Sequence, residues 1–151
     1  MREFEGLIEK LTRISGLQME IDDNNSVTLE YGDLMITLQF RDECQDILFL
    51  SEISDGYKYL NLSRQLFRHA LKLSFAGIGT YGNFLGLLKD ELVLSKSVSI
   101  TNLSAEALAK HLLAFAKNAS TVRDELINKM QDEEIAYDKD SSQQYDITAA
   151  L

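Results

Sequence analysis

This 151-residue sequence contains no proline, no tryptophan and a single cysteine, Cys44. The lack of proline excludes cis-prolyl turns and proline-rich recognition segments. One cysteine cannot form an intramolecular disulfide, which favours a reducing compartment. Basic residues are also scarce, because 15 Lys and Arg stand against 24 Asp and Glu, for a formal net charge of -9. Phosphate backbones are bound through a clustered positive field, so nucleic acid is not an expected partner.

Long apolar runs are absent as well. No run approaches the roughly 18 residues typical of a membrane-spanning helix. The N-terminus, MREFEGLIEK, lacks the uninterrupted apolar segment of a signal peptide. With 45% hydrophobic residues, the chain can form one domain with a hydrophobic core. The sequence therefore predicts a cytoplasmic protein that does not insert into membranes.

A helix near the middle of the chain is the most informative element that is present. Between residues 62 and 75, apolar side chains cover more than half of the helical wheel. A surface helix of a monomer needs one apolar face, so this helix should bury one face against its own sheet and another against a second copy. The sequence therefore predicts a homodimer through the middle helix. The alternative is a central helix wrapped by its own chain.

Hydrophobic periodicity divides the rest of the chain into helices and strands. Apolar residues at steps of three and four predict a first helix that ends at Gly16 and a last helix that begins after Ser104. Three or four consecutive strands follow the first helix, and a hairpin follows the middle one. These strands are expected at residues 27–31, 34–40, 47–50, 84–88 and 92–100, with a further alternation at Met19 and Ile21. The predicted class is α+β, in the order α-β-β-β-α-β-β-α, with helices packed on a twisted antiparallel sheet.

The last helix carries a narrow apolar stripe from Leu108 to Met130. Such a stripe is typical of a helix that lies on a flat surface and of a coiled-coil seam; its length of about three heptads favours packing on the sheet. Beyond Met130 the periodicity is lost and the sequence becomes acidic and polar. We therefore expect one domain over residues 1–130 and a flexible acidic tail over residues 131–151.

The sequence contains little that predicts catalysis, a metal site or a cofactor. Residues 77–82 match G-x-G-x-x-G, but dinucleotide binding needs a strand before this motif and a helix after it, and here the order is reversed. His69 and His111 are expected on helix surfaces, without metal-site spacing. Cys44 has acidic neighbours, which disfavour a nucleophilic thiolate. An enzyme is the weaker hypothesis, and we expect no cofactor.

Several segments follow one another in a distinctive order. The strand Ile47-Leu48-Phe49-Leu50-Ser51-Glu52-Ile53 precedes a helix that ends in Phe75-Ala76-Gly77-Ile78-Gly79-Thr80, and Leu85-Gly86-Leu87 then precedes Leu92-Val93-Leu94-Ser95. This order resembles the class I chaperones of bacterial type III secretion, the Tir/CesT-like family. The resemblance covers about residues 1–130, and the tail at residues 131–151 departs from it.

The resemblance implies an acidic cytoplasmic homodimer that binds the unfolded N-terminal segments of secreted effector proteins. It hands them to the secretion apparatus without consuming ATP, and the secretion ATPase or sorting platform is a further implied partner. The implied dimer interface comprises Leu66, Phe67, Ala70, Leu71, Phe75 and Leu85. The implied effector-binding residues, some of which must be core, are Leu7, Leu11, Ile14, Met19, Ile21, Val27, Leu29, Ile36, Leu38 and Leu48. The alternatives are a non-secretion adaptor or regulator on the same fold and a ligand-binding protein or enzyme that uses residues 77–82, which we call the glycine corner.

Overall fold

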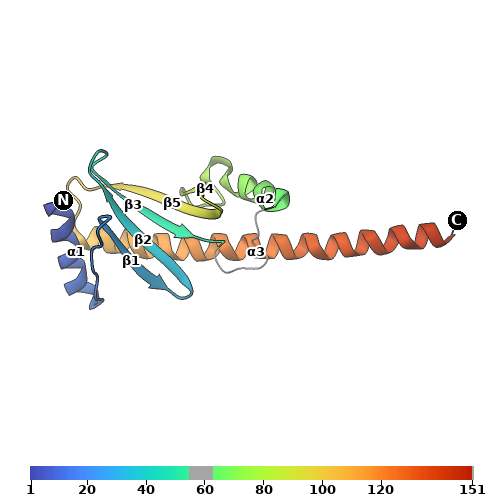
Figure 1. The fold of residues 1–151 in the computed structure, drawn as a ribbon, viewed down its shortest axis with the longest axis horizontal. Coiled ribbons are helices and arrows are strands. Elements are labelled where there is room, and N and C mark those ends of the chain that lie inside the picture. The colour runs from blue at the N-terminus through green and yellow to red at the C-terminus, as the bar shows by residue number, and fades with distance from the viewer. Residues whose placement is uncertain (55–62, 151) are drawn as a thin grey trace.

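The computed structural model of this protein describes residues 1–54 and 63–150, with side chains except at residues 134–150. A short 3-10 helix, Phe75–Gly77, follows the middle helix. The main elements, drawn in Figure 1, are α1 (Arg2–Ser15), β1 (Ser26–Tyr31), β2 (Leu34–Arg41), β3 (Asp46–Glu52), α2 (Arg64–Ser74), β4 (Phe84–Leu88), β5 (Glu91–Ser99) and α3 (Ala105–Ala150). The predicted α+β class and order of elements are confirmed, although the alternation around Met19 and Ile21 lies in a loop.

The five strands form one antiparallel sheet in the order β1-β2-β3-β5-β4. β1 and β4 are therefore its two edges. Leu38 of β2 lies opposite Val27 of β1 and Phe49 of β3, and Phe49 lies opposite Lys96 of β5. Because side chains alternate between the faces of a sheet, these residues share one face.

Two helices cover this face and form the hydrophobic core with it. Phe4 of α1 stacks on Phe40 of β2, with ring centroids 5.5 Å apart. Phe49 of β3 packs against Phe115 of α3, with ring centroids 5.6 Å apart. Figure 1 shows α3 crossing behind the sheet. Most of the predicted stripe is buried there, at Leu108, Phe115, Ala119, Val122 and Leu126. The prediction that the last helix packs on the sheet is confirmed.

The other face of the sheet carries a polar network. Arg41 donates from Nε to Oδ1 of Asp46 at 2.8 Å, and the hydroxyl of Ser97 donates to Oδ2 of the same carboxylate. The hydrogen bond from Arg41 lowers the pKa of the Asp46 carboxyl, against the opposing effect of burial. The network joins β2, β3 and β5 across this face.

The helix termini agree with the capping residues in the sequence. Gly16 ends α1 with φ 71, a conformation that glycine adopts without strain. The Ser63 hydroxyl accepts from the Leu66 N–H at 3.1 Å, and the Ser104 hydroxyl accepts from the Ala107 N–H at 3.1 Å. The sequence places the apolar Leu62 directly before Ser63, which predicts a hydrophobic contact with Phe67, but Leu62 lies outside the described residues.

The end of α3 differs from the sequence prediction. The helix was expected to end near Met130, but it continues to Ala150. At 46 residues it is about 69 Å long, from a rise of about 1.5 Å per residue, and it extends well beyond the sheet (Figure 1). Loss of apolar periodicity removes the stripe that packs on the sheet, but it does not by itself end a helix. The flexibility of residues 131–151 stays a prediction.

The contact between α3 and the sheet can be tested by removing one aromatic ring. Phe115→Ala leaves a cavity against Phe49 and should lower the free energy of unfolding by about 3–5 kcal/mol. Leu113→Ala, on the exposed side of the same helix, should change it by less than about 1 kcal/mol. Urea unfolding at one fixed protein concentration measures both. Equal effects of the two substitutions would contradict this description of the core.

Candidate protein-binding surfaces

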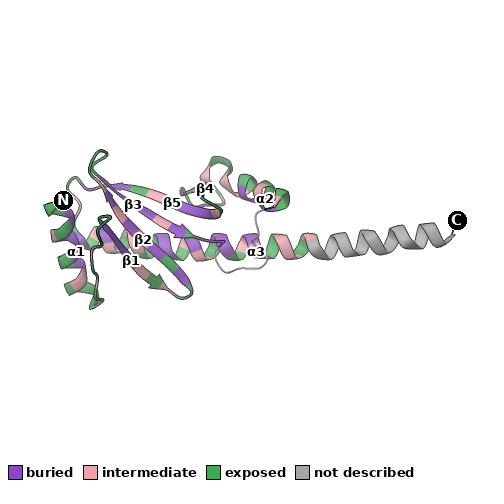
Figure 2. Ribbon diagram, in the orientation of Figure 1, coloured by how far each residue is buried: buried purple, intermediate pink, exposed green. Residues whose placement is uncertain are grey.

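The α2 helix has one apolar face inside the domain and another exposed. Leu66 and Ala70 are buried in the core, whereas Leu71 and Phe75 at its end are 74% and 75% exposed. The prediction of a helix with two apolar faces is confirmed. Figure 2 shows exposed residues along α2 and the adjoining β4.

The exposed apolar surface continues from α2 through the glycine corner into β4. Single exposed apolar residues are ordinary on protein surfaces, but seven of them within residues 71–88 are a concentration typical of interaction surfaces. We call this surface the α2–β4 patch. It comprises Leu71, Phe75, Ile78, Tyr81, Phe84, Leu87 and Leu88, all of which are exposed.

The structure divides the predicted dimer-interface residues into two groups. Leu66 and Ala70 lie in the core of their own chain, so a second chain would not reach them. Leu71 and Phe75 belong to the α2–β4 patch, and Phe67 and Leu85 are half-buried beside it. The wheel of a helix shows that two faces are apolar, but only the position of α3 and the sheet shows which one is covered.

A rigid corner holds the patch in shape. Ala76, Gly77 and Gly82 have φ values of 53, 69 and 79, which turn the chain from α2 into β4. Thr80 and Asn83 are buried and exchange two hydrogen bonds of 2.8 Å, each from a side chain to the other residue's carbonyl oxygen. Helix precedes and strand follows this G-x-G-x-x-G segment, as the sequence indicated, so the glycines form a turn rather than a phosphate-binding loop.

A second apolar surface is a groove of about 230 Å³ between α1, β1 and α3. It lies along β1, an edge strand of the sheet, and we call it the α1–α3 groove. Four predicted effector-binding residues, Leu11, Met19, Leu29 and Ile36, line it, and of these Leu11 and Ile36 are buried core residues at its base. The other lining residues are Ser15, Leu17, Glu30, Tyr31, Ala109, Leu112, Leu113 and Ala116.

The remaining predicted effector-binding residues are dispersed. Leu7, Val27 and Leu38 are buried in the core. Ile14 is exposed near the end of α1, Ile21 is half-buried in the loop before β1, and Leu48 is half-buried on the other face of the sheet. Leu17 and Leu113 were not predicted as binding residues: Leu17 continues the alternation of Met19 and Ile21, whereas Leu113 lies outside the apolar stripe of the last helix.

The prediction of a helix-surface position is wrong for His69, and His111 is more covered than expected. His69 is buried, and its Nε2 lies 2.9 Å from Oε1 of Glu133 on α3, although this contact lacks hydrogen-bond alignment. His111 is half-buried, with Nδ1 3.1 Å from the Lys96 ammonium. Burial lowers the pKa of His111, and Lys96 lowers it further. The basic residues that precede them in the sequence, Arg68 and Lys110, do not indicate that the histidines are exposed, since adjacent residues of a helix point about 100° apart.

Residues 1–54 and 63–133, whose side chains are described, contain no group of His, Cys, Asp or Glu arranged to hold a metal ion. Cys44 is an exposed thiol in the β2–β3 turn. Within the same part of the chain, no helix combines the length and the apolar character needed to cross a bilayer. The features that stand out are therefore the two apolar surfaces.

A family model described as the Tir chaperone protein (CesT) family matches residues 6–123. This match confirms the resemblance drawn from the sequence. No curated protein sequence is detectably similar to the chain.

Solved structures share the fold at low sequence identity. The HopA1–SchA chaperone–effector complex has a TM-score of 0.63 and 16% identity, over 81% of this chain and 94% of that chain. The Yersinia pestis type III secretion chaperone SycH, in complex with a YscM2 fragment, has a TM-score of 0.58 and 19% identity, over 79% of this chain and 98% of that chain. YbjN from E. coli, described as a proposed transcription regulator, has a TM-score of 0.55 and 16% identity, over 78% of this chain and 87% of that chain.

The rigidity of the glycine corner leads to a prediction with a matched control. A Cβ at Gly79 would lie 2.7 Å from the Leu73 carbonyl oxygen, whereas a Cβ at Gly86 would meet nothing within 4 Å. Gly79→Ala should therefore lower the free energy of unfolding by about 1–3 kcal/mol, and Gly86→Ala should leave it within about 0.5 kcal/mol. Thermal or urea unfolding compares the two. A Gly79→Ala variant as stable as the control would contradict the close packing of this corner.

Proposed function

Because this chain belongs to the Tir chaperone protein (CesT) family, we propose that it is a homodimeric chaperone of type III secretion. It binds the unfolded N-terminal segment of a secreted effector in the cytoplasm and keeps it competent for secretion. It then delivers the effector to the secretion apparatus, through the secretion ATPase or sorting platform. The observation that carries this proposal is that one small domain exposes two separate apolar surfaces, the α2–β4 patch and the α1–α3 groove.

The α2–β4 patch supports self-association. Burying one Leu or Phe side chain contributes about 1.5–3 kcal/mol, so a contact between two such patches can offset the entropy lost on association. In a dimer with two-fold symmetry, the α2–β4 patch of one chain contacts the same patch of the other chain, so the interface needs only one self-complementary surface. We assign Leu71 and Phe75 to the centre of the interface, with Phe67 and Leu85 at its margin.

The α1–α3 groove supports binding of an unfolded segment. β1 is an edge strand, so its outer backbone groups are available to pair with an extended peptide. Leu29 and Tyr31 of β1 line the groove. A peptide added to β1 would therefore place alternate side chains beside an apolar depression, which combines backbone pairing with side-chain burial. Such binding requires no chemical step.

A second candidate function is that of an adaptor or regulator that binds a folded partner. The observation in its favour is that YbjN shares the fold over 78% of this chain. The two functions differ in the state of the partner: a secretion chaperone binds an unfolded N-terminal segment, and an adaptor binds a folded surface. Capture of binding partners separates them.

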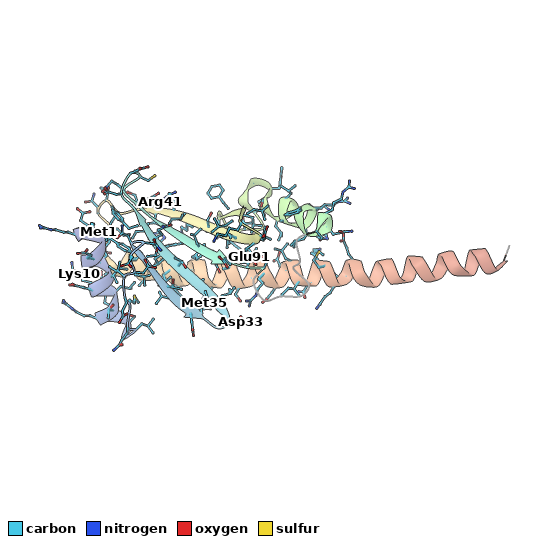
Figure 3. The ribbon with its side chains drawn as sticks, in the orientation of Figure 1. Met1, Lys10, Asp33, Met35, Arg41 and Glu91 are labelled. Atoms are coloured by element: carbon cyan, nitrogen blue, oxygen red, sulfur yellow. The ribbon has the colours of Figure 1, made fainter. Side chains whose placement is uncertain are left out.

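The proposed dimer makes a prediction for the α2–β4 patch. Leu71→Asp places a charge at the centre of the interface and should convert the dimer to monomer or soluble aggregate. Met35→Asp is the matched control, since Met35 is also an exposed apolar residue but lies on the β1–β2 hairpin (Figure 3). Sedimentation velocity measures both variants. A folded Leu71→Asp variant that dimerises as tightly as Met35→Asp would overturn the interface.

The proposed effector site makes a separate prediction. The tagged chain should capture secreted proteins from a lysate of its own bacterium, retained through their N-terminal segments. Leu113→Glu, in the α1–α3 groove, should weaken this binding about tenfold or more while leaving the dimer intact. Cys44→Ser is the control and should bind normally, since holding an unfolded segment needs no thiol. Mass spectrometry and titration of a captured segment measure the effect.

Two results would contradict the proposed site. Equal binding by Leu113→Glu and by the unchanged chain would remove the effector from the α1–α3 groove. Recovery of only folded metabolic or regulatory proteins would favour the adaptor function.

A further inference from the structure

The α2 helix is positively charged, although the chain as a whole has a net charge of -9. No Asp or Glu occurs in the sequence between residues 56 and 89. Arg64, Arg68 and Lys72 are exposed on α2 and follow at steps of four, so they form a row along one side of the helix. We call these residues the cationic row. It borders Leu71 and Phe75, which makes the exposed face of α2 both cationic and apolar.

An open groove of about 1070 Å³ follows this face of α2. Its walls contain the cationic row and one acidic residue, Glu133 of α3. The remaining lining residues are Gln65, Phe67, Leu71 and Phe75. Positive charges beside apolar side chains match a segment that carries acidic and apolar residues together.

The proposed homodimer places a constraint on the cationic row. The row lies beside the α2–β4 patch, so a two-fold contact through that patch brings the rows of both chains to the interface. Like charges brought together oppose association unless acidic groups lie between them. Among the described residues that line the groove, the acidic one is Glu133, and its carboxylate is already in contact with His69 of the same chain.

The C-terminal part of α3 carries acidic and apolar residues in the required combination. Its acidic residues in the sequence are Asp132, Glu133, Glu134, Asp138, Asp140 and Asp146, and its apolar residues include Ile135, Tyr137, Tyr145 and Ile147. Helix α3 passes α2 near Glu133 and continues straight to Ala150 (Figure 1). Residues 134–150 extend about 25 Å as a helix, compared with about 16 Å for the 11 residues of α2. This part of α3 therefore leads away from its own cationic row.

We propose that residues 132–150 of each α3 dock in the α2 groove of the other chain of the homodimer. The net negative charge of this segment complements the cationic row, and its apolar residues add to the contact made by the α2–β4 patch. This inference rests on the proposed homodimer and assigns a partner to the cationic row and a role to the C-terminal part of α3. The interaction is reciprocal, because each chain supplies one groove and one acidic helix end.

The main test neutralises charges in the full-length chain. The variant D138N/D140N/D146N should raise the dimer dissociation constant on the order of tenfold at low salt, because a few partly exposed ion pairs together contribute about that factor. The difference should shrink in 0.5 M NaCl. The control E3Q/E5Q/E9Q neutralises three exposed residues of α1 and should leave the constant within about twofold. Sedimentation equilibrium measures all three chains.

A second test asks whether the contact forms between chains. R64E/R68E/K72E should also weaken the homodimer, and mixing it with the full-length variant D138K/D140K/D146K should give a heterodimer tighter than either homodimer. In mixed ¹⁵N-labelled and unlabelled protein, a zero-length carbodiimide should join Lys72 to acidic residues of the other chain. Isotopically mixed cross-linked peptides would identify the contact as intermolecular.

Three experimental results would each overturn the proposed docking of α3. A dimer whose affinity is the same after neutralisation of α3 and of α1 overturns the docking and leaves the proposed homodimer intact. Cross-links from Lys72 that form only within one chain overturn it as well. A full-length chain that stays monomeric at every concentration and salt overturns the homodimer itself, and with it this inference.

Discussion

The structure depends on the packing of α3 across one face of the sheet. Phe115 meets Phe49 at the centre of this contact, and α1 covers the neighbouring part through Phe4 and Phe40. A five-stranded sheet in a chain of this length leaves few elements to cover anything else. α2 is therefore held at one end of the domain, where Leu66 packs into the core and His69 meets Glu133 of α3. Its other face stays exposed.

This arrangement leaves two apolar surfaces uncovered on the described part of the chain. The glycine corner directs apolar side chains outward and is held rigid by the paired Thr80 and Asn83. At the opposite edge of the sheet, β1 has no neighbouring strand on its outer side, and its Leu29 and Tyr31 contribute to the apolar lining of the groove. The two surfaces lie on opposite edge strands, so the proposed dimer contact and the proposed binding of an extended segment do not compete for the same surface.

Acidic residues are unevenly distributed along the sequence. The strongly acidic composition coexists with a cationic exposed face on α2, because the acidic residues of the sequence lie before residue 56 and after residue 89. In an acidic protein, such a face is more readily matched by another part of the same protein than by nucleic acid, which the rest of the surface would repel. In the proposed homodimer, the same distribution would give the contact a hydrophobic component that salt does not weaken and an electrostatic component that salt does weaken.

The sequence by itself determined the elements, their order and the antiparallel sheet, because periodicity, caps such as Ser63 and Ser104, and turn glycines are local signals. It also showed that α2 has two apolar faces. Only the tertiary structure decided which residues of α2 are covered, that Leu7, Val27 and Leu38 are core while Met19 and Leu29 line a groove, and that His69 is buried. Burial depends on contacts between elements far apart in the chain, and no local pattern records them. The length of α3 was missed for the converse reason, since a helix can continue where its apolar stripe has ended.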